Sequence, residues 1–276
     1  ERKAFKKQLK AQAESEEKQE ASSEPGRLFF VRFEGSKDAD EVENLREEIT
    51  AILQLAKPQD EVLVSLESPG GTVQGYGLGA AQLLRIRERQ IRLSVAVDRV
   101  AASGGYLMAC VAHQILASPF AILGSIGVVA GLPNFHRLLA KNSIDYKEYT
   151  AGEFKRTVSL LGEITEKGEE KFKQQLESIH IQFKDFVSSH RPQLNLAAVA
   201  TGEHWLASEA LGLGLVDRLV TSDDFLLEKF AQGWPIYQVK YTRKQKLVQR
   251  LTSQFTQAFT RNMGLWLEKF ESRMFS

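Results

Sequence analysis

Short apolar runs alternate with longer amphipathic segments between residues 28 and 97. The runs are rich in Leu, Val and Phe, and they have the length of β-strands buried on both faces. The segments between them repeat apolar residues at steps of three and four, which predicts helices. The expected strands are Leu28–Phe33, Val62–Leu66 and Ile91–Val97, and the expected helices are 42–56 and 73–89. This order is that of a parallel α/β sheet, and it constrains the fold more than any other feature.

The same alternation continues toward the C-terminus. We expect a helix at Gly104–Ala112, a strand at Ile115–Ala117, a helix at Asn134–Lys141 and a strand at Asp145–Tyr149. A long helix then ends near Arg191, and its apolar stripe indicates a core or subunit contact. The stripe consists of Phe172, Leu176, Ile179, Phe183, Phe186 and Val187. A short helix at Leu206–Leu211 and a late strand at Ile236–Val239 complete the pattern.

The chain divides into three predicted parts. Residues 1–26 form a charged stem and linker, because they hold too little apolar surface to offset the entropy of ordering. Residues 27–241 form the α/β domain. Residues 242–276 form a basic amphipathic helix, suited to a partner helix or a membrane surface.

Composition excludes some function classes. The 36 Lys and Arg residues balance 35 Asp and Glu residues, so no global basic field favours nucleic acid. The single cysteine, Cys110, excludes an intrachain disulfide and a cysteine-rich metal site. No run of about 18 apolar residues occurs. The sequence starts at Glu1 rather than at methionine, so we interpret it as a fragment or processed form.

A serine stands on a sharp turn in the stretch V-A-A-S-G-G-Y, Val100–Tyr106. The turn lies between a predicted strand and a run of small residues, so the Ser103 hydroxyl is expected at a helix start. Unpaired backbone N–H groups there favour developing negative charge. The alternative is a structural turn in which small residues allow close packing and Ser103 caps the helix.

A second turn, S-P-G-G at Ser68–Gly71, follows another predicted strand. Proline fixes one backbone angle, and the two glycines allow successive N–H groups to form a concavity for an oxyanion. The alternative is an ordinary turn from strand to helix. Strand ends of a parallel sheet converge on one crevice, so this turn and the Ser103 turn are expected to meet.

A serine nucleophile needs a base. None of the five histidines adjoins an Asp-containing motif, so local signals do not support a Ser-His-Asp triad. His113 and His180 fall on predicted helices, and His136 and His204 lie in or beside short helices. A neutral lysine is the other available base, but burial must lower an ordinary lysine pKa by about 3 units. Lys155 in G-E-F-K-R-T is one candidate among many.

Five motifs, in order and spacing, resemble the signal peptide peptidase A family over roughly residues 27–220. They are S-P-G-G, V-A-A-S-G-G-Y, G-S-I-G-V, G-E-F-K-R-T and G-E-H-W-L-A-S-E-A-L-G-L-G-L-V-D. The resemblance implies an α/β ClpP/crotonase-like fold with a parallel sheet and flanking helices, extended by helical N- and C-terminal tails. It implies a serine endopeptidase without cofactor or metal.

The resemblance also implies the site residues. Ser103 is expected as nucleophile, Lys155 as general base and Ser125 as the hydroxyl that orients the lysine amine. Gly71 and Gly104 are the expected oxyanion donors, with Gly70 as the alternative to Gly71. His113 departs from the family pattern, since an acidic residue is expected there.

The resemblance further implies partners and location. A homo-oligomer is expected, in which a neighbouring subunit can supply the lysine. A missing N-terminal segment is expected to anchor the chain in a bacterial inner membrane, with the catalytic domain facing the periplasm. Signal-peptide remnants or damaged membrane proteins are the expected substrates.

Two other functions remain open from the residues. A crotonase-like acyl-CoA enzyme could use the same backbone donors to hold a thioester enolate, although the motif loops lack a pair of carboxylates. A non-catalytic membrane-associated scaffold would explain the charged stem and the amphipathic tail.

Overall fold

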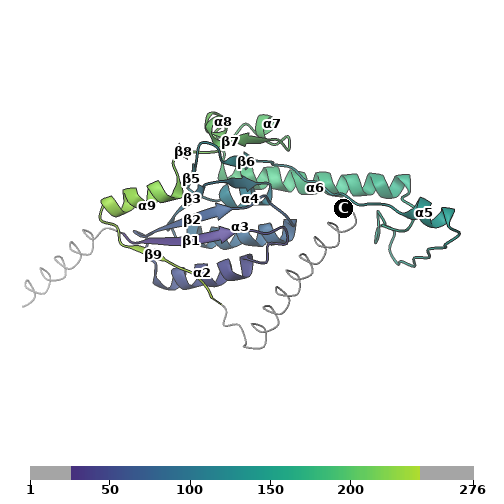
Figure 1. The fold of residues 1–276 in the computed structure, drawn as a ribbon, viewed down its shortest axis with the longest axis horizontal. Coiled ribbons are helices and arrows are strands. Elements are labelled where there is room, and N and C mark those ends of the chain that lie inside the picture. Colours follow the sequence, from purple (N-terminus) through teal and green to yellow (C-terminus); the bar gives the residue numbers. More distant parts are fainter. Residues whose placement is uncertain (1–25, 243–276) are drawn as a thin grey trace, which may run out of the picture. The chain divides into compact units, whose positions relative to one another are not determined.

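The computed structural model describes residues 26–242, and its centre is a six-stranded parallel sheet (Figure 1). The strand order is β8-β5-β3-β2-β1-β9, and every neighbouring pair is parallel. The strands are β1 (Leu28–Glu34), β2 (Glu61–Glu67), β3 (Arg92–Val97), β5 (Gln114–Ala117), β8 (Arg218–Leu219) and β9 (Ile236–Gln238). The predicted parallel α/β fold is confirmed.

A second, smaller sheet follows the carboxyl ends of the central strands. It contains β4 (Val100–Ala102), β6 (Ile122–Gly124) and β7 (His204–Leu206), with β4 parallel and β7 antiparallel to β6. A bridge between Ser68 and Ala101 joins it to the segment that leaves β2. The sequence did not predict this sheet, because three-residue strands are too short to show alternation.

Helices cover both faces of the large sheet. The helices are α2 (Val42–Leu55), α3 (Val73–Glu88), α4 (Gly104–Ala109), α5 (His136–Lys141), α6 (Glu166–His190), α7 (Leu196–Val199), α8 (Ala207–Gly212) and α9 (Ser222–Ala231). Side chains of α2, α3 and α4 share one apolar core with alternate residues of the strands. On the opposite face, Phe225 of α9 packs in a second core with Leu28, Phe30 and Leu63.

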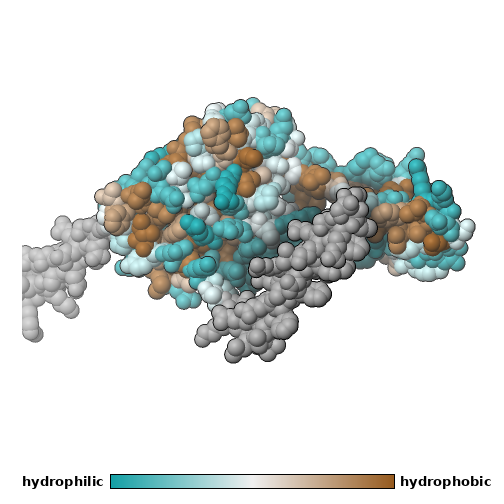
Figure 2. Space-filling model, viewed as in Figure 1, coloured by the Kyte–Doolittle hydropathy of each residue, from teal (hydrophilic) through white to brown (hydrophobic). Residues whose placement is uncertain are grey.

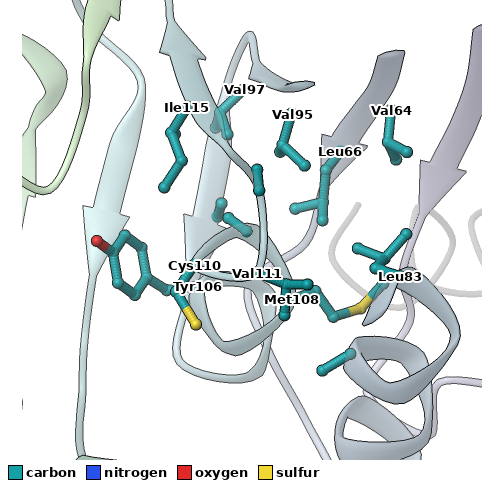
Figure 3. Packing of buried hydrophobic residues seen from close by; sticks show 14 of the residues in the cluster. Val64, Leu66, Leu83, Val95, Val97, Tyr106, Met108, Cys110, Val111 and Ile115 are labelled. Atoms are coloured by element: carbon teal, nitrogen blue, oxygen red, sulfur yellow. The ribbon is translucent and has the colours of Figure 1, made fainter. Parts of the chain in front are cut away.

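The first core fixes the position of α4, the helix that follows Ser103. Figure 3 shows Val64, Leu66 and Val95 pointing from the sheet toward Met108 and Val111. All five are almost completely buried, and a buried side chain of this kind contributes about 1.5–3 kcal/mol relative to an exposed one. Apolar packing therefore holds the C-terminal part of α4, and the residues that follow it, against the sheet.

Two predicted elements were wrong. Asp145–Tyr149 is not a strand, and every residue from 141 to 150 is exposed. The α4 helix ends at Ala109 rather than Ala112, so His113 is not helical. Its backbone N–H donates to Leu93 O (2.9 Å) and its Nδ1 accepts from Leu93 N–H (3.0 Å), because the chain leaves the helix there to join the sheet. The predicted stem and C-terminal helix lie almost entirely outside the described residues.

A buried ion pair ties the end of α6 to the sheet. The Arg191 guanidinium, only 4% exposed, donates two hydrogen bonds to Asp217 (2.8 and 2.7 Å) and one to Gly214 O (2.8 Å). Asp217 also accepts from Ile115 N–H at the start of β5 (2.7 Å). One carboxylate thus satisfies both a buried charge and a strand N–H.

We predict that Asp217→Ala lowers the free energy of unfolding by about 2–4 kcal/mol, because Arg191 is left buried without its carboxylate. Urea denaturation of both variants and of the parent chain measures the change. Glu228→Ala is the control: it removes the exposed partner of Arg218 and should cost less than about 1 kcal/mol. Equal losses in the two variants would contradict this role of the pair.

Candidate active site

Ser103 occupies a strained turn between β4 and α4. Its backbone angles are φ 52° and ψ −118°, a region that L-residues rarely adopt and that costs about 1–3 kcal/mol. Two hydrogen bonds hold it there: Ser103 N–H donates to Gly124 O (2.8 Å), and Leu107 N–H donates to Ser103 O (2.9 Å). The Ser103 hydroxyl makes no capping hydrogen bond to α4. The alternative of a capping serine is therefore not observed.

The S-P-G-G turn lies directly against Ser103, as the strand-end argument predicted. Gly70 has φ +90°, and a Cβ there would lie 2.7 Å from Ser103 Cβ and 2.9 Å from Gly104 N. Only glycine fits this approach, since a side chain would meet both steric conflict and an unfavourable φ.

The three glycines predicted as oxyanion donors differ in what their N–H groups do. Gly70 N–H donates to Ser68 Oγ (3.0 Å). Neither Gly71 N–H nor Gly104 N–H has an acceptor within residues 26–242, and both residues line the cavity beside Ser103. The geometry therefore favours Gly71 over Gly70 as the partner of Gly104.

Ser125 lies next to the Ser103 turn. Ala102 pairs with Gly124 at the ends of β4 and β6, and paired strands lie about 4.8 Å apart. Ser103 and Ser125 are the residues that directly follow these two strand ends. Ser125 also has a positive φ of 53°, and its N–H donates to Glu203 O (2.6 Å). The two serines predicted from separate motifs are thus neighbours.

His180 of α6 holds the loop after Ser125. Its Nε2 lies 3.2 Å from Ile126 O and 3.1 Å from Ala200 O. Both partners are acceptors, so Nε2 carries the proton. None of the five histidines lines the cavity beside Ser103.

An apolar cavity of about 300 Å³ opens beside Ser103. Its walls come from α3, α4, α6 and the segment after β6. The apolar lining includes Val73, Tyr76, Ala80, Leu107, Val128, Ile179, Phe183 and Phe186. Part of the stripe predicted on the long helix therefore forms a cavity wall, which the sequence pattern alone could not separate from ordinary core.

Lys155 does not reach this cavity within one chain. It is exposed, and the two residues before it contact the first turns of α6: Glu153 pairs with Lys167, and the Phe154 ring lies 5.3 Å from Lys171 Nζ. The cavity meets α6 only from Ile179 onward, about 12 Å further along the helix axis. Figure 1 shows the segment around α5 at the far end of α6 from the sheet.

Neither the thiol of Cys110 nor any group of metal-ligating side chains within residues 26–242 forms a second centre. Cys110 is fully buried, and burial raises the pKa of its thiol to about 12, as expected for an inert thiol. Within residues 26–242, no group of three or more His, Cys, Asp or Glu side chains is arranged to hold a metal ion.

The parallel sheet and its flanking helices give the chain a fold that is known from solved structures. The chain has the α/β ClpP/crotonase-like fold of two solved variants, one serine-to-alanine and one lysine-to-alanine, of the membrane-bound stomatin-specific protease 1510-N. The TM-scores are 0.53 and 0.52 at 14% and 15% identity, covering 79% and 83% of this chain and 100% and 98% of those chains.

The chain belongs to peptidase family S49. The family pattern matches residues 85–233, and the pattern of the S49 N-terminal region matches residues 1–83. The chain is 54% identical to the probable protease SohB of Haemophilus influenzae over 82% of its length, and 52% identical to that of Buchnera aphidicola over 73%. The five motifs also resemble the SohB branch of this family, and the identity to these relatives confirms that resemblance. The chain spans 64% and 66% of those two relatives.

No helix among the described residues has both the length and the apolar character needed to cross a bilayer.

We predict that Gly70→Ala lowers the free energy of unfolding by about 1–3 kcal/mol, because alanine meets both the positive φ and Ser103 Cβ. Gly212→Ala on α8 is the matched control, since its Cβ would meet nothing within 4 Å. The control should be neutral or slightly stabilising. Chemical denaturation compares the two, and a Gly70→Ala variant as stable as the control would refute the steric argument.

Proposed function

We propose that the chain is a serine endopeptidase in which Ser103 is the nucleophile and Lys155 the general base. The observation that carries the proposal is the strained Ser103 turn with the acceptor-free N–H groups of Gly71 and Gly104 beside it. Strain of this kind persists where surrounding structure enforces it, and it is common at nucleophiles.

In the proposed reaction, the Lys155 amine accepts the Ser103 proton while Ser103 Oγ attacks the peptide carbonyl. The Gly71 and Gly104 N–H groups stabilise the oxyanion of the tetrahedral intermediate. The Lys155 ammonium then protonates the leaving amine of the substrate. The Lys155 amine, neutral again, activates the water that hydrolyses the acyl-enzyme. Ser125 orients the amine beside Ser103.

A neighbouring copy of the chain supplies Lys155 in this proposal. The segment from 129 to 160 carries exposed apolar side chains, including Val129 (94% exposed), Tyr149 (88%), Leu138, Ile144 and Phe154. Figure 2 shows apolar surface gathered over the segment around α5. Contact with a second copy would cover this surface and remove water from Lys155, which favours the neutral amine.

Substrates are peptides with an apolar side chain, and the apolar cavity supports this choice. Signal-peptide remnants and damaged membrane proteins both supply such segments. We place the enzyme at a bacterial inner membrane with the domain facing the periplasm, anchored by a segment outside this sequence. The bacterial relatives and the membrane-bound fold neighbour support that location.

We predict that Ser103→Ala and Lys155→Ala each lower the hydrolysis of fluorescent casein by at least about a thousandfold. Lys141→Ala, an exposed lysine on the same segment, is the control and should keep most of the activity. Unfolding curves show whether the variants stay folded. Retained activity in either variant would refute the dyad.

Labelling separates the other two functions. A fluorophosphonate should modify Ser103 in the parent chain and not in Ser103→Ala. Saturable coenzyme A binding without labelling would instead support the acyl-CoA enzyme, and assembly without turnover would support the scaffold.

Lysine supply by a neighbour gives a separate prediction. Inactive Ser103→Ala and Lys155→Ala chains, co-expressed in equal amounts, should recover about a quarter of the parent activity, because only half of the chains keep Ser103 and only half of these face a neighbour that keeps Lys155. Each variant expressed alone is the control. Recovery no greater than the sum of the two controls would place the lysine in the same chain as the serine.

A further inference from the structure

A chain of hydrogen bonds runs beneath the S-P-G-G turn. Gly70 N–H donates to Ser68 Oγ (3.0 Å), Ser68 Oγ is bonded to the Tyr76 hydroxyl, and Tyr76 OH donates to Ser36 O (2.8 Å). The last acceptor is a carbonyl, so the Tyr76 proton points to Ser36. The Ser68 proton must therefore point to Tyr76, and every donor in the chain has one acceptor.

Ser68 and Tyr76 are both completely buried. Burial raises the pKa of the Tyr76 phenol, so the hydroxyl stays protonated at neutral pH. A buried hydroxyl bonded on both sides has one orientation, since any rotation leaves a polar group unpaired.

The same two residues contact the Ser103 side of the site. Ser68 N–H donates to Val100 O (2.8 Å), and Ala102 N–H donates to Ser68 O (3.0 Å), which fixes Ser68 against β4. The Tyr76 ring lies against Gly104 so closely that a Cβ there would be 2.4 Å from the ring Cγ. Ser68 and Tyr76 thus touch both turns that carry the proposed oxyanion donors.

Because Gly70 N–H already donates to Ser68 Oγ, Gly71 N–H is the donor of this turn that remains for an oxyanion. The adjoining peptide is held from the other side, because Thr72 N–H donates to Lys37 O (2.9 Å). Gly71 N–H lies between two peptide groups whose hydrogen bonds are fixed, and it is the group left to face the cavity.

We propose that Ser68 and Tyr76 are positioning residues, which hold the Gly71 and Gly104 N–H groups in the direction needed for the oxyanion. This inference rests on the proposed function. It assigns the Tyr76 hydroxyl to the stabilisation of the transition state, and the Tyr76 ring to the cavity wall.

The test separates the hydroxyl from the ring. Tyr76→Phe keeps the ring and removes the hydroxyl, and Ser68→Ala removes the other half of the bond. Each should lower kcat about 10- to 100-fold on a fluorogenic peptide while KM changes less than about threefold. The double variant should be about as slow as the slower single variant, because both changes break one chain of bonds.

Tyr106→Phe is the matched control. Tyr106 is equally buried and its hydroxyl also donates to a backbone carbonyl, Leu215 O (3.1 Å), but it makes no hydrogen bond to the S-P-G-G turn. Its kcat should stay within about threefold of the parent, although it loses a comparable buried hydrogen bond. Urea unfolding of all variants compares their stabilities.

A peptide aldehyde, which forms a tetrahedral adduct with a serine, gives the decisive readout. Its affinity should fall in parallel with kcat/KM in Tyr76→Phe and Ser68→Ala, whereas the affinity of the same peptide as an amide should not change. Parent-like kcat in folded Tyr76→Phe and Ser68→Ala, or unchanged aldehyde affinity, would overturn the inference. Activity in Ser103→Ala would overturn the proposed function instead, so the two failures are distinguishable.

Discussion

The pairing of Ser68 with β4 is the constraint on which the site depends. Two backbone hydrogen bonds, to Val100 O and from Ala102 N, fix the register between the end of the large sheet and the start of the small one. That register places Gly70 against Ser103, and the β4–β6 ladder places Ser125 beside it. Main-chain pairing therefore brings together segments far apart in the sequence, and the side-chain hydrogen bonds of Ser68 and Tyr76 then hold the S-P-G-G turn in place.

The strained backbone of Ser103 persists because the elements on both sides of it are held in place. The packed core holds α4 on one side, and the ladder to Gly124 holds β4 on the other. A turn between two fixed elements has no conformation to relax into, which is how a few kcal/mol of local strain persist. The turns around Ser103 also pack too closely for side chains at three positions. A Cβ at Gly70, Gly104 or Gly105 would meet an atom within 3 Å.

The fold could be predicted from the sequence where the apolar runs are long. Val62–Leu66 and Ile91–Val97 are continuous buried runs, and both are strands at nearly those bounds. The strands β4, β6 and β7 were missed, because three residues are too few to show periodicity. A strand was predicted at 145–149, where residues 26–242 provide no strand to pair with it. In the site, the convergence of strand ends in a parallel sheet predicted that the two turns meet. The resemblance already preferred Gly71 to Gly70, but the physical reason was not visible in the sequence, because it is one hydrogen bond from Gly70 N–H to the Ser68 side chain. Tyr76 falls within the predicted helix 73–89, and nothing in the sequence distinguishes its hydroxyl from that of an ordinary packed tyrosine.

The long α6 helix explains why one chain holds only part of the proposed site. Its C-terminal half builds the cavity wall and, through His180, the loop after Ser125, whereas its first turns hold Glu153 and Phe154 beside Lys155. The length of the helix separates these two ends, so the lysine does not lie beside the serine in this structure. If a second copy supplies the lysine, the contact that completes the dyad is also the contact that dries it. Assembly would then control both the position and the protonation of the base, and a single chain at low concentration would carry a serine without a base.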